Sequence, residues 1–349
     1  MLTAYRTRYG APDVLSVREV ANPEPGPGDI LVRVHAATVN RTDCGVLSGK
    51  PYVFRFFVGW PRPPVGATGT DFAGEVVAVG GSVREFRPGD RVMGFHDHGL
   101  GTHAELVCMR ADRPIQRIPP TVGYAHAAAS LEGAHYAINF ITKVQLRPGD
   151  SVLVNGATGA IGSAAVALLA HRGMRVTAVA AGPHLDRVSR LGAARVIDFT
   201  KAPFVEQLQG ERFPVVFDAV GKSTFGICRA LLPRDGVYLS SELGPYCENP
   251  VRALLAPFLP GPKVRFPVPV DIRRSLRIID ELLRTGWCPM LDRHYDLHGI
   301  RDAFAYVASG QKIGNVVLAL SPAGLPPGTG TSATCWATTP GAFATCERA

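Results

Sequence analysis

The chain has 349 residues, 46% of them apolar and 19% charged, which is typical of a soluble globular protein and long enough for two domains. Its formal net charge is +8, but the 37 basic residues are scattered, and no run of Lys and Arg with interleaved aromatics indicates a nucleic-acid groove. No apolar segment reaches membrane-spanning length, and the start, MLTAYRTRYG, lacks the core of a signal peptide, so we expect a cytoplasmic protein without a membrane partner.

The first 120 residues are predicted to be rich in β-strands. A Pro/Gly turn at 25–28 opens a strand over 29–34, a second strand covers 74–80, and a turn at Pro88 and Gly89 leads into a third that ends at Gly94. From about residue 124 helices and strands alternate, which indicates a parallel sheet with helices on both faces. The expected elements are a helix over 125–142, strands over 152–154, 175–180, 194–199, 214–220 and 236–240, an amphipathic helix over 271–285 and a closing strand over 315–320.

The stretch from Ser151 to Ala170, SVLVNGATGAIGSAAVALLA, combines a buried strand, three glycines at three-residue spacing and the start of a helix. Gly156 would let the strand turn, Gly159 would let backbone approach a pyrophosphate, and Gly162 would let the helix pack on the strand. The N–H groups and the dipole at the helix start favour bound phosphate. This order of elements predicts a dinucleotide site.

The choice of cofactor depends on the end of the strand over 175–180. An NAD site usually has Asp or Glu there to bond the ribose hydroxyls, and such a carboxylate would repel a 2′-phosphate. This chain has no acid before Asp186, so we expect NADPH in preference to NADH. His184 and Arg187 are the candidates to meet the 2′-phosphate, although both also suit exposed helix positions.

The tail over 321–349 is rich in Pro, Gly and Thr and has no periodicity, so we expect it to be disordered, with a partner-binding tail as the alternative. It contains two of the seven cysteines. The cysteines show no paired spacing, which favours reduced thiols in the cytoplasm.

Seven motifs spread over residues 1–320 together resemble one family: VHAATVNRTDCGVLSG, GTDFAGEVVAVG, RPGDRVMGF, the glycine stretch, GAARVIDF, FDAVG and GQKIGNVVL. This family is the medium-chain dehydrogenase/reductase superfamily, in its zinc-independent quinone oxidoreductase-like branch. The resemblance implies an α/β protein in which a Rossmann doubly wound parallel sheet domain (124–287) is inserted in a β-rich GroES-like catalytic domain (1–123 and 288–320). The tail over 321–349 lies outside both.

The resemblance also predicts that no zinc is bound. Zinc-dependent relatives have Cys where this chain has Asn40, His-Glu where it has Thr70 and Asp71, and Cys or Asp near Ser130; Asn and Thr are poor zinc ligands. Of the four cysteines of the structural zinc lobe, only Cys108 lies in that region.

The best rival for a metal site is the histidine-rich loop GFHDHGLGTH, with His96, His98 and His103. Histidines in a glycine-rich loop are more often polar loop residues than ligands. We therefore expect no metal.

The resemblance assigns cofactor contacts to residues from both domains. Phe199 would lie beside the adenine, although a place in the core is the alternative. The predicted contacts are Asn40, Gly156, Ala157, Thr158, Gly159, Ala160, Ile161, Gly162, His184, Arg187, Phe199, Val220, Gly221, Ser240, Ser241, Lys312 and Asn315.

Without zinc, hydrogen-bond donors must stabilise the developing oxyanion. The predicted catalytic residues are Asn40, Thr42 and Tyr52, in the segment that lines the nicotinamide end in relatives; Tyr52 is the best proton donor by chemistry. His135 and Tyr136 fall where relatives face the cleft, although a core histidine is the usual role for a residue such as His135.

The sequence thus predicts an NADPH-dependent oxidoreductase that transfers a hydride to a quinone or an α,β-unsaturated carbonyl without zinc. A zinc-free alcohol dehydrogenase or ketone reductase and a non-catalytic NADPH-binding sensor are the alternatives. By resemblance, we also expect a homodimer formed through the edge of the dinucleotide-domain sheet.

Overall fold

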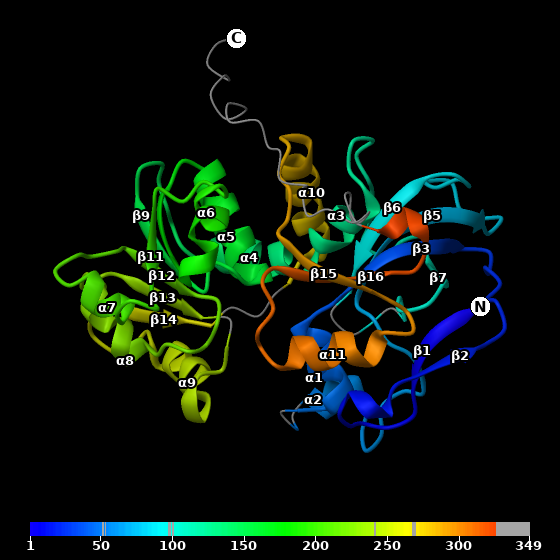
Figure 1. Cartoon of the computed structure of the whole chain (residues 1–349), viewed down its shortest axis with the longest axis horizontal. Coiled ribbons are helices and arrows are strands. Elements are labelled where there is room, and N and C mark those ends of the chain that lie inside the picture. Colours follow the sequence, from blue (N-terminus) through cyan, green and yellow to red (C-terminus); the bar gives the residue numbers. More distant parts are fainter. Residues whose placement is uncertain are drawn as a thin grey trace, which may run out of the picture.

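Two β-sheets lie side by side and organise the molecule (Figure 1). The computed structural model describes residues 1–50, 52, 54–96, 99, 101–240, 242–266 and 270–325. The middle of the chain forms the left-hand part of Figure 1, and the first and last described segments form the right-hand part together. The predicted insertion of a parallel-sheet domain into a β-rich domain is therefore confirmed.

The inserted domain contains a six-stranded parallel sheet with the order β11-β10-β9-β12-β13-β14. Its strands are β9 (Ser151–Asn155), β10 (Arg175–Ala180), β11 (Arg195–Asp198), β12 (Val215–Asp218), β13 (Val237–Ser240) and β14 (Lys263–Arg265). Five of these were predicted; β14 was missed because it is only three residues long and two of them are charged. Successive side chains of β9 enter different clusters, Val152 and Val154 one and Leu153 another, so the sheet is buried on both faces.

The helices of this domain are α5 (Ala160–His171), α6 (Leu185–Ser189), α7 (Phe204–Gln207), α8 (Phe225–Cys228), α9 (Glu248–Leu255) and α10 (Ile272–Arg284). Two more helices, α3 (Tyr124–Ala129) and α4 (Glu132–Ile141), precede the sheet, and α4 packs against both α5 and α10. The single helix expected over 125–142 is wrong. The buried Ser130 hydroxyl donates to the Ala127 carbonyl at 2.7 Å where α3 ends, and the chain restarts as α4 at Glu132.

The β-rich domain contains a seven-stranded sheet of β3 (Asp29–Val39), β5 (Asp71–Val79), β6 (Arg91–Phe95), β7 (Leu106–Arg110), β8 (Ile115–Arg117), β15 (Leu291–Asp296) and β16 (Asn315–Ala319). A smaller sheet contains β1 (Leu2–Arg6), β2 (Ser16–Glu19) and β4 (Gly66–Ala67), and the helices are α1 (Arg41–Ser48), α2 (Phe54–Val58) and α11 (Ile300–Ala308). β16 pairs antiparallel with β3, with Val316 opposite Val39. The last strand of the described chain therefore joins the sheet that the N-terminal strands form.

Short 3₁₀ turns cover Pro12–Val14, Gly182–His184, Arg229–Leu231, Pro245–Cys247 and Pro322–Gly324. The last of these falls inside the expected disordered tail: Ser321 bonds the His35 ring nitrogen at 2.5 Å, and Gly324 packs on the His35 backbone. Ordered chain thus continues five residues past the predicted boundary, and residues 326–349 lie outside the described part.

In the described ranges no helix is both long and apolar enough to cross a membrane. The described cysteines, five of the seven, are all free thiols, as expected.

Candidate functional site

The glycine turn after β9 has two glycines that the fold requires and one that leaves open space. Gly156 has φ +83°, and a Cβ there would lie 1.7 Å from Cγ2 of Val220. A Cβ on Gly162 would lie 2.1 Å from the Gly156 carbonyl oxygen. At Gly159, by contrast, the nearest atom to such a Cβ is 3.7 Å away.

Gly159 is also the N-cap of α5, and no side chain caps this helix. A helix start without a side-chain cap suits an anion such as a pyrophosphate, and a glycine at the cap leaves room for it. The chain thus fits the predicted nicotinamide dinucleotide at this turn.

The segment 311–315 of the β-rich domain crosses to the same turn. Gly314 forms a bridge with Gly159, and its N–H donates to the Thr158 carbonyl at 2.6 Å. Lys312 donates to the Gly314 carbonyl, whereas the Asn315 amide is held by the Met290 carbonyl at 3.0 Å. The two predicted contacts of this segment therefore do lie beside the glycine turn, with the Asn315 amide already engaged.

An acid that the sequence argument missed lies beside the end of β10. A Cβ on Gly182 would be 2.8 Å from Oδ2 of Asp198, the last residue of β11. Hydrogen bonds from Thr200 lower the pKa of Asp198 and hold its carboxylate in place, at 2.6 Å from the hydroxyl. The sequence prediction considers only residues that follow β10 in the chain, whereas the parallel sheet brings an acid from the neighbouring strand β11.

Three other predicted cofactor contacts lie near the end of β10, in different surroundings. The Arg187 guanidinium donates to the Leu291 carbonyl at 2.8 Å, so it ties α6 to β15. The Phe199 ring is 52% exposed, so it does not lie in the core. His184 ends a 3₁₀ turn after β10.

The turn after β12 is shaped by the buried Asp218. Its carboxylate accepts from Asn155 at 3.0 Å, from the Tyr238 hydroxyl at 2.9 Å and from the N–H groups of Val220 and Gly221. Ser240 ends β13, bonded to the Glu242 backbone, and Ser241 lies outside the described residues.

Among the predicted catalytic residues, Asn40 follows β3 directly and caps α1. Its side chain accepts from the Asp43 N–H at 2.8 Å, and Asp43 in turn accepts from the Asn40 N–H at 3.0 Å. The Asn40 amide donates to the Thr70 hydroxyl at 3.0 Å. Asn40 therefore holds the start of α1 in place. This structural role is independent of the catalytic role predicted for it.

Asp71 is fully buried beside Asn40. It accepts from the Thr38 N–H at 2.6 Å and from the Thr38 hydroxyl. Burial raises the pKa of Asp71 to about 7, against the hydrogen bonds from Thr38, and burial together with the charge of Asp71 raises that of Asp43 well above its ordinary value. These polar groups satisfy one another, and the residues at the zinc positions do not fit a zinc ion.

His103, one of the three histidines of the rival metal site, is engaged by neighbouring protein groups. Its ring nitrogens bond the Thr68 hydroxyl and the Thr38 carbonyl, both at 2.9 Å, and burial lowers its pKa to about 4. His98 is outside the described residues, and those that are described contain no group of three His, Cys, Asp or Glu side chains that could hold a metal.

Thr42 reaches the other domain, and Tyr52 does not take part in that contact. The Thr42 hydroxyl donates to Glu132 of α4 at 2.7 Å and lies 3.4 Å from the Tyr136 hydroxyl. The Tyr52 ring is 62% exposed and stacks with the Arg55 guanidinium. The sequence analysis did not single out Glu132. Its only signal was an acidic residue shortly before His135 and Tyr136, which were named as facing the cleft in relatives.

His135, next to Tyr136 in the sequence, points elsewhere. Its Nδ1 bonds the Ser275 hydroxyl of α10 at 2.9 Å, and burial lowers its pKa to about 4. These contacts agree with the alternative that His135 is a core histidine.

Comparisons with known proteins fit this arrangement. Residues 26–120 match the family described as alcohol dehydrogenase GroES-like domain, and residues 191–318 match the family described as zinc-binding dehydrogenase. The second range does not include Asn40, Thr70 or Asp71.

Two curated relatives cover different shares of the chain. A quinone oxidoreductase of Pseudomonas aeruginosa is 31% identical over 224 residues, 62% of this chain and 66% of the relative, so slightly less than two thirds of that relative's length is spanned. A 2-methylene-furan-3-one reductase of Solanum lycopersicum is 28% identical over 89% of this chain and 77% of the relative.

Solved structures share the fold over nearly the whole described chain. The quinone oxidoreductase of Coxiella burnetii superposes with a TM-score of 0.80 at 22% identity, over 92% of this chain and 99% of that one. The Escherichia coli quinone oxidoreductase, solved in complex with NADPH, gives a TM-score of 0.75 at 22% identity, over 91% of this chain and 100% of that one.

Gly159 and Gly162 form a matched pair for testing the dinucleotide site. Gly162→Ala should lower the melting temperature, because its Cβ would collide with the Gly156 carbonyl. Gly159→Ala should leave the melting temperature unchanged but weaken NADPH binding by about tenfold or more, because the methyl group fills the space left for phosphate. Melting curves and NADPH fluorescence titration check both, and an alanine at 159 that binds as tightly as glycine would contradict the site.

Asp71 should make the stability depend on pH. Its folded pKa of about 7 exceeds the ordinary 3.8, so its stabilising contribution is complete below about pH 4 and is lost as the pH rises through 7. The advantage of wild type over Asp71→Asn should therefore shrink between pH 4 and pH 8, by up to about 4 kcal/mol. Urea unfolding of both proteins measures this difference, in which the opposite effect of His103 cancels; a difference independent of pH would refute it.

Proposed function

We propose that this chain, which belongs to the medium-chain dehydrogenase/reductase superfamily and is an NAD(P)H-dependent oxidoreductase, transfers a hydride from NADPH to a quinone or an α,β-unsaturated carbonyl without zinc. The observation that carries this proposal is the glycine turn. Its open face at Gly159 is bridged by Gly314 to the domain that carries Asn40 and Thr42. A cofactor held there would have its reactive end where the two domains meet.

The bound nicotinamide supplies the hydride, and the protein supplies position and polarity. The first turn of α5 would hold the pyrophosphate, and the half-buried Lys312, next to Gly314, would add a positive charge beside it. Thr42 and Tyr136 offer hydroxyl groups at the domain junction for the oxygen on which negative charge develops.

The zinc-free part of the proposal rests on the bonds among Asn40, Thr70 and Asp71. A catalytic zinc needs three good ligands and an open position. Here the amide of Asn40 and the carboxylate of Asp71 are engaged with neighbouring protein groups. The polarising role therefore falls to hydroxyl groups.

The preference for NADPH rests on the absence of an acid directly after β10 up to Asp186. His184 follows this strand and is the remaining predicted contact for a 2′-phosphate, since Arg187 is bonded to the β15 backbone. Asp198 acts against this preference, and its bonds to Thr200 fix its carboxylate.

Turnover tests the proposal directly. NADPH oxidation with 1,4-benzoquinone and an enone should proceed equally with and without chelator, and NADPH should give a higher kcat/KM than NADH. Activity abolished by chelator would refute the zinc-free mechanism. Turnover of a ketone alone, or NADPH binding without turnover of any acceptor, would support a ketone reductase or a sensor instead. A preference for NADH would identify Asp198 as the acid that binds the ribose.

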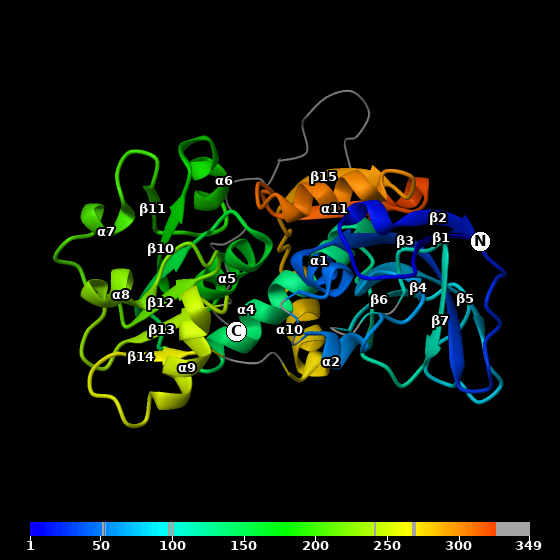
Figure 2. The ribbon, with the colours of Figure 1, turned by 90° about the horizontal axis from the view of Figure 1, so that it is seen from below.

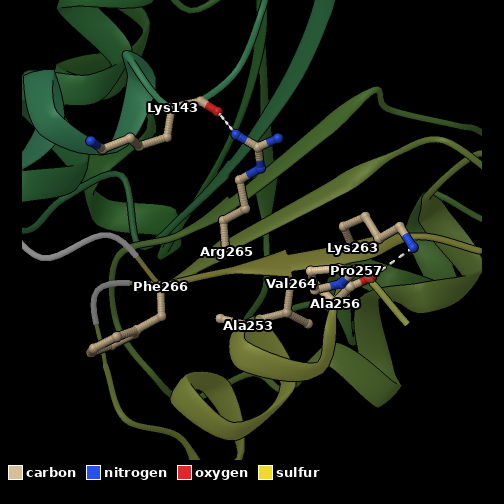
Figure 3. A pocket seen from close by; sticks show the side chains of 8 residues that line it. All are labelled: Lys143, Ala253, Ala256, Pro257, Lys263, Val264, Arg265 and Phe266. Atoms are coloured by element: carbon tan, nitrogen blue, oxygen red, sulfur yellow. Dashed lines mark hydrogen bonds between the residues drawn. The ribbon is translucent and has the colours of Figure 1, made fainter. Parts of the chain in front are cut away.

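We also propose that two copies pair through β14 and α9. Within the described residues β14 pairs with β13 alone, so its outer edge is bare. Leu254 and Phe258, on and just after α9, are 77% and 83% exposed. Between α9 and β14 lies a pocket of about 460 Å³ in which Phe266 and Val264 are flanked by Lys143, Lys263 and Arg265 (Figure 3). A second copy would cover both the strand edge and the apolar helix face.

Charge on the apolar face should break this assembly. Leu254→Asp with Phe258→Asp should shift the mass in light scattering from two chains to one, because each carboxylate would be buried in the interface. Val65→Asp, at an exposed apolar residue of the β-rich domain, is the control and should leave the mass unchanged. A wild type that is already a monomer at micromolar concentration would overturn the dimer.

A further inference from the structure

A second pocket of the inserted domain brings two arginines together. It has a volume of about 190 Å³ and is bounded by the ends of α4 and α5, by the segments that lead into β9 and β10, and by the first turn of α10. Figure 2 shows α4 between α5 and α10. The residues that line the pocket are Ile141, Thr142, Val144, Leu146, Leu169, Arg172, Met174 and Arg274.

This pocket is separate from the glycine turn. It lies at the edge of the parallel sheet where β9 and β10 begin, whereas the glycine turn follows the other end of β9. The helix α5 runs from one place to the other with 12 residues, a length of about 18 Å. A ligand in the pocket would therefore leave the proposed cofactor site free.

The walls of the pocket are largely apolar. Ile141, Leu169 and Met174 are buried. The one hydroxyl group among the lining residues, that of Thr142, donates to the Asn139 carbonyl at 3.0 Å. The free side-chain donors of the pocket are therefore those of its two arginines.

The two arginines face the pocket without a counter-ion. Arg172, directly after α5, is half-buried, and Arg274, the third residue of α10, is exposed. Within the described parts of the chain neither guanidinium group has a hydrogen bond or an ion pair. Burial lowers the pKa of Arg172, and the positive charge of Arg274 lowers it further. The two charges thus repel each other at a partly desolvated place.

Helix dipoles explain only one of these cations. The end of a helix favours a positive charge, which suits Arg172 after α5. The start of a helix favours a negative charge, yet Arg274 lies in the first turn of α10. Asp271 caps this start and accepts from the Arg274 N–H at 3.0 Å. The Arg274 side chain is therefore placed unfavourably twice, at a helix start and beside a second arginine, and an anion between the two guanidinium groups would compensate both effects.

We propose that this pocket binds a small phosphate monoester with an apolar substituent, with the phosphate group between Arg172 and Arg274. Such a phosphate carries about two negative charges at neutral pH, which matches two guanidinium groups, and its oxygens suit the paired N–H donors of arginine. The apolar walls suit the substituent. The volume of about 190 Å³ lies below the roughly 300–1,000 Å³ of sites for drug-sized ligands, which favours a small ester over a nucleotide.

Phenyl phosphate is the probe, added to protein saturated with NADPH so that the glycine turn is occupied. Isothermal titration calorimetry should show one site per chain that binds phenyl phosphate more tightly than inorganic phosphate, because the ring contacts the apolar walls. Added NaCl should weaken this binding. Arg172→Gln and Arg274→Gln should each weaken it by about tenfold or more, since each removes charge-assisted bonds to phosphate, and should leave the NADPH dissociation constant unchanged.

Two control variants separate this pocket from other sources of binding. Arg277→Gln changes an exposed arginine of α10, one turn after Arg274, that does not line the pocket, and should bind phenyl phosphate as wild type does. Gly159→Ala, which alters the cofactor turn, should also bind it normally, even without NADPH. Failure of cofactor binding and failure of the pocket are thereby distinguished.

Four results would overturn the assignment. The first is the absence of saturable phenyl phosphate binding by wild type. The second is binding that survives in the double variant of Arg172→Gln and Arg274→Gln. The third is an equal loss in Arg277→Gln and Arg274→Gln, because binding would then reflect the general charge of α10. The fourth is inorganic phosphate bound as tightly as phenyl phosphate, which would refute the apolar substituent. Because Arg274 is exposed, its replacement should leave the melting temperature of the free protein unchanged, so that a loss of binding is not a loss of fold.

Discussion

Close contact between backbones is the constraint on which the site depends. Four segments meet around the start of α5, and a side chain is missing at each contact. Gly162 lies on the Gly156 carbonyl, Gly133 on that of Ala160, and Gly314 on that of Met290. A Cβ at any of the three would come within 2.6 Å of a carbonyl oxygen, so the segments could not approach as they do. Glycine thus fixes how closely neighbouring segments pack within each domain, next to the place where Gly314 bridges to Gly159.

This approach of backbones determines which polar side chains meet. Because α4 starts against α5, Glu132 lies within hydrogen-bond distance of Thr42 on the other domain. Because Gly314 bridges to Gly159, Lys312 lies near the same carboxylate. Arg41 and Glu242 form a further ion pair across the junction at 3.7 Å, but both are partly exposed and contribute little to stability. The buried contacts, rather than this ion pair, define the geometry.

Sequence reasoning succeeded where the signal was local. The strand, the glycine turn and the helix from Ser151 onward were predicted because their order alone requires them, and the alternation of elements gave the parallel sheet. Sequence reasoning missed contacts between segments that are far apart in the chain. Asp198 lies beside Gly182 only because β11 pairs with β10, and Glu132 accepts a hydrogen bond from Thr42, which is 90 residues away. Tyr52, predicted as a proton donor for its chemistry, is largely exposed in the structure, and its catalytic role stays a prediction.

The residues at the zinc positions of the relatives bond one another and their neighbours in the core. A site without the metal must still satisfy every buried polar group that would have faced it. Here Asn40 turns its amide to Thr70, Asp71 accepts two bonds from Thr38, and His103 spans Thr68 and Thr38. Asp71 carries a raised pKa and His103 a lowered one, so near neutral pH both shifts favour the uncharged forms. The region is therefore a hydrogen-bonded support for the start of α1, and through α1 for Thr42.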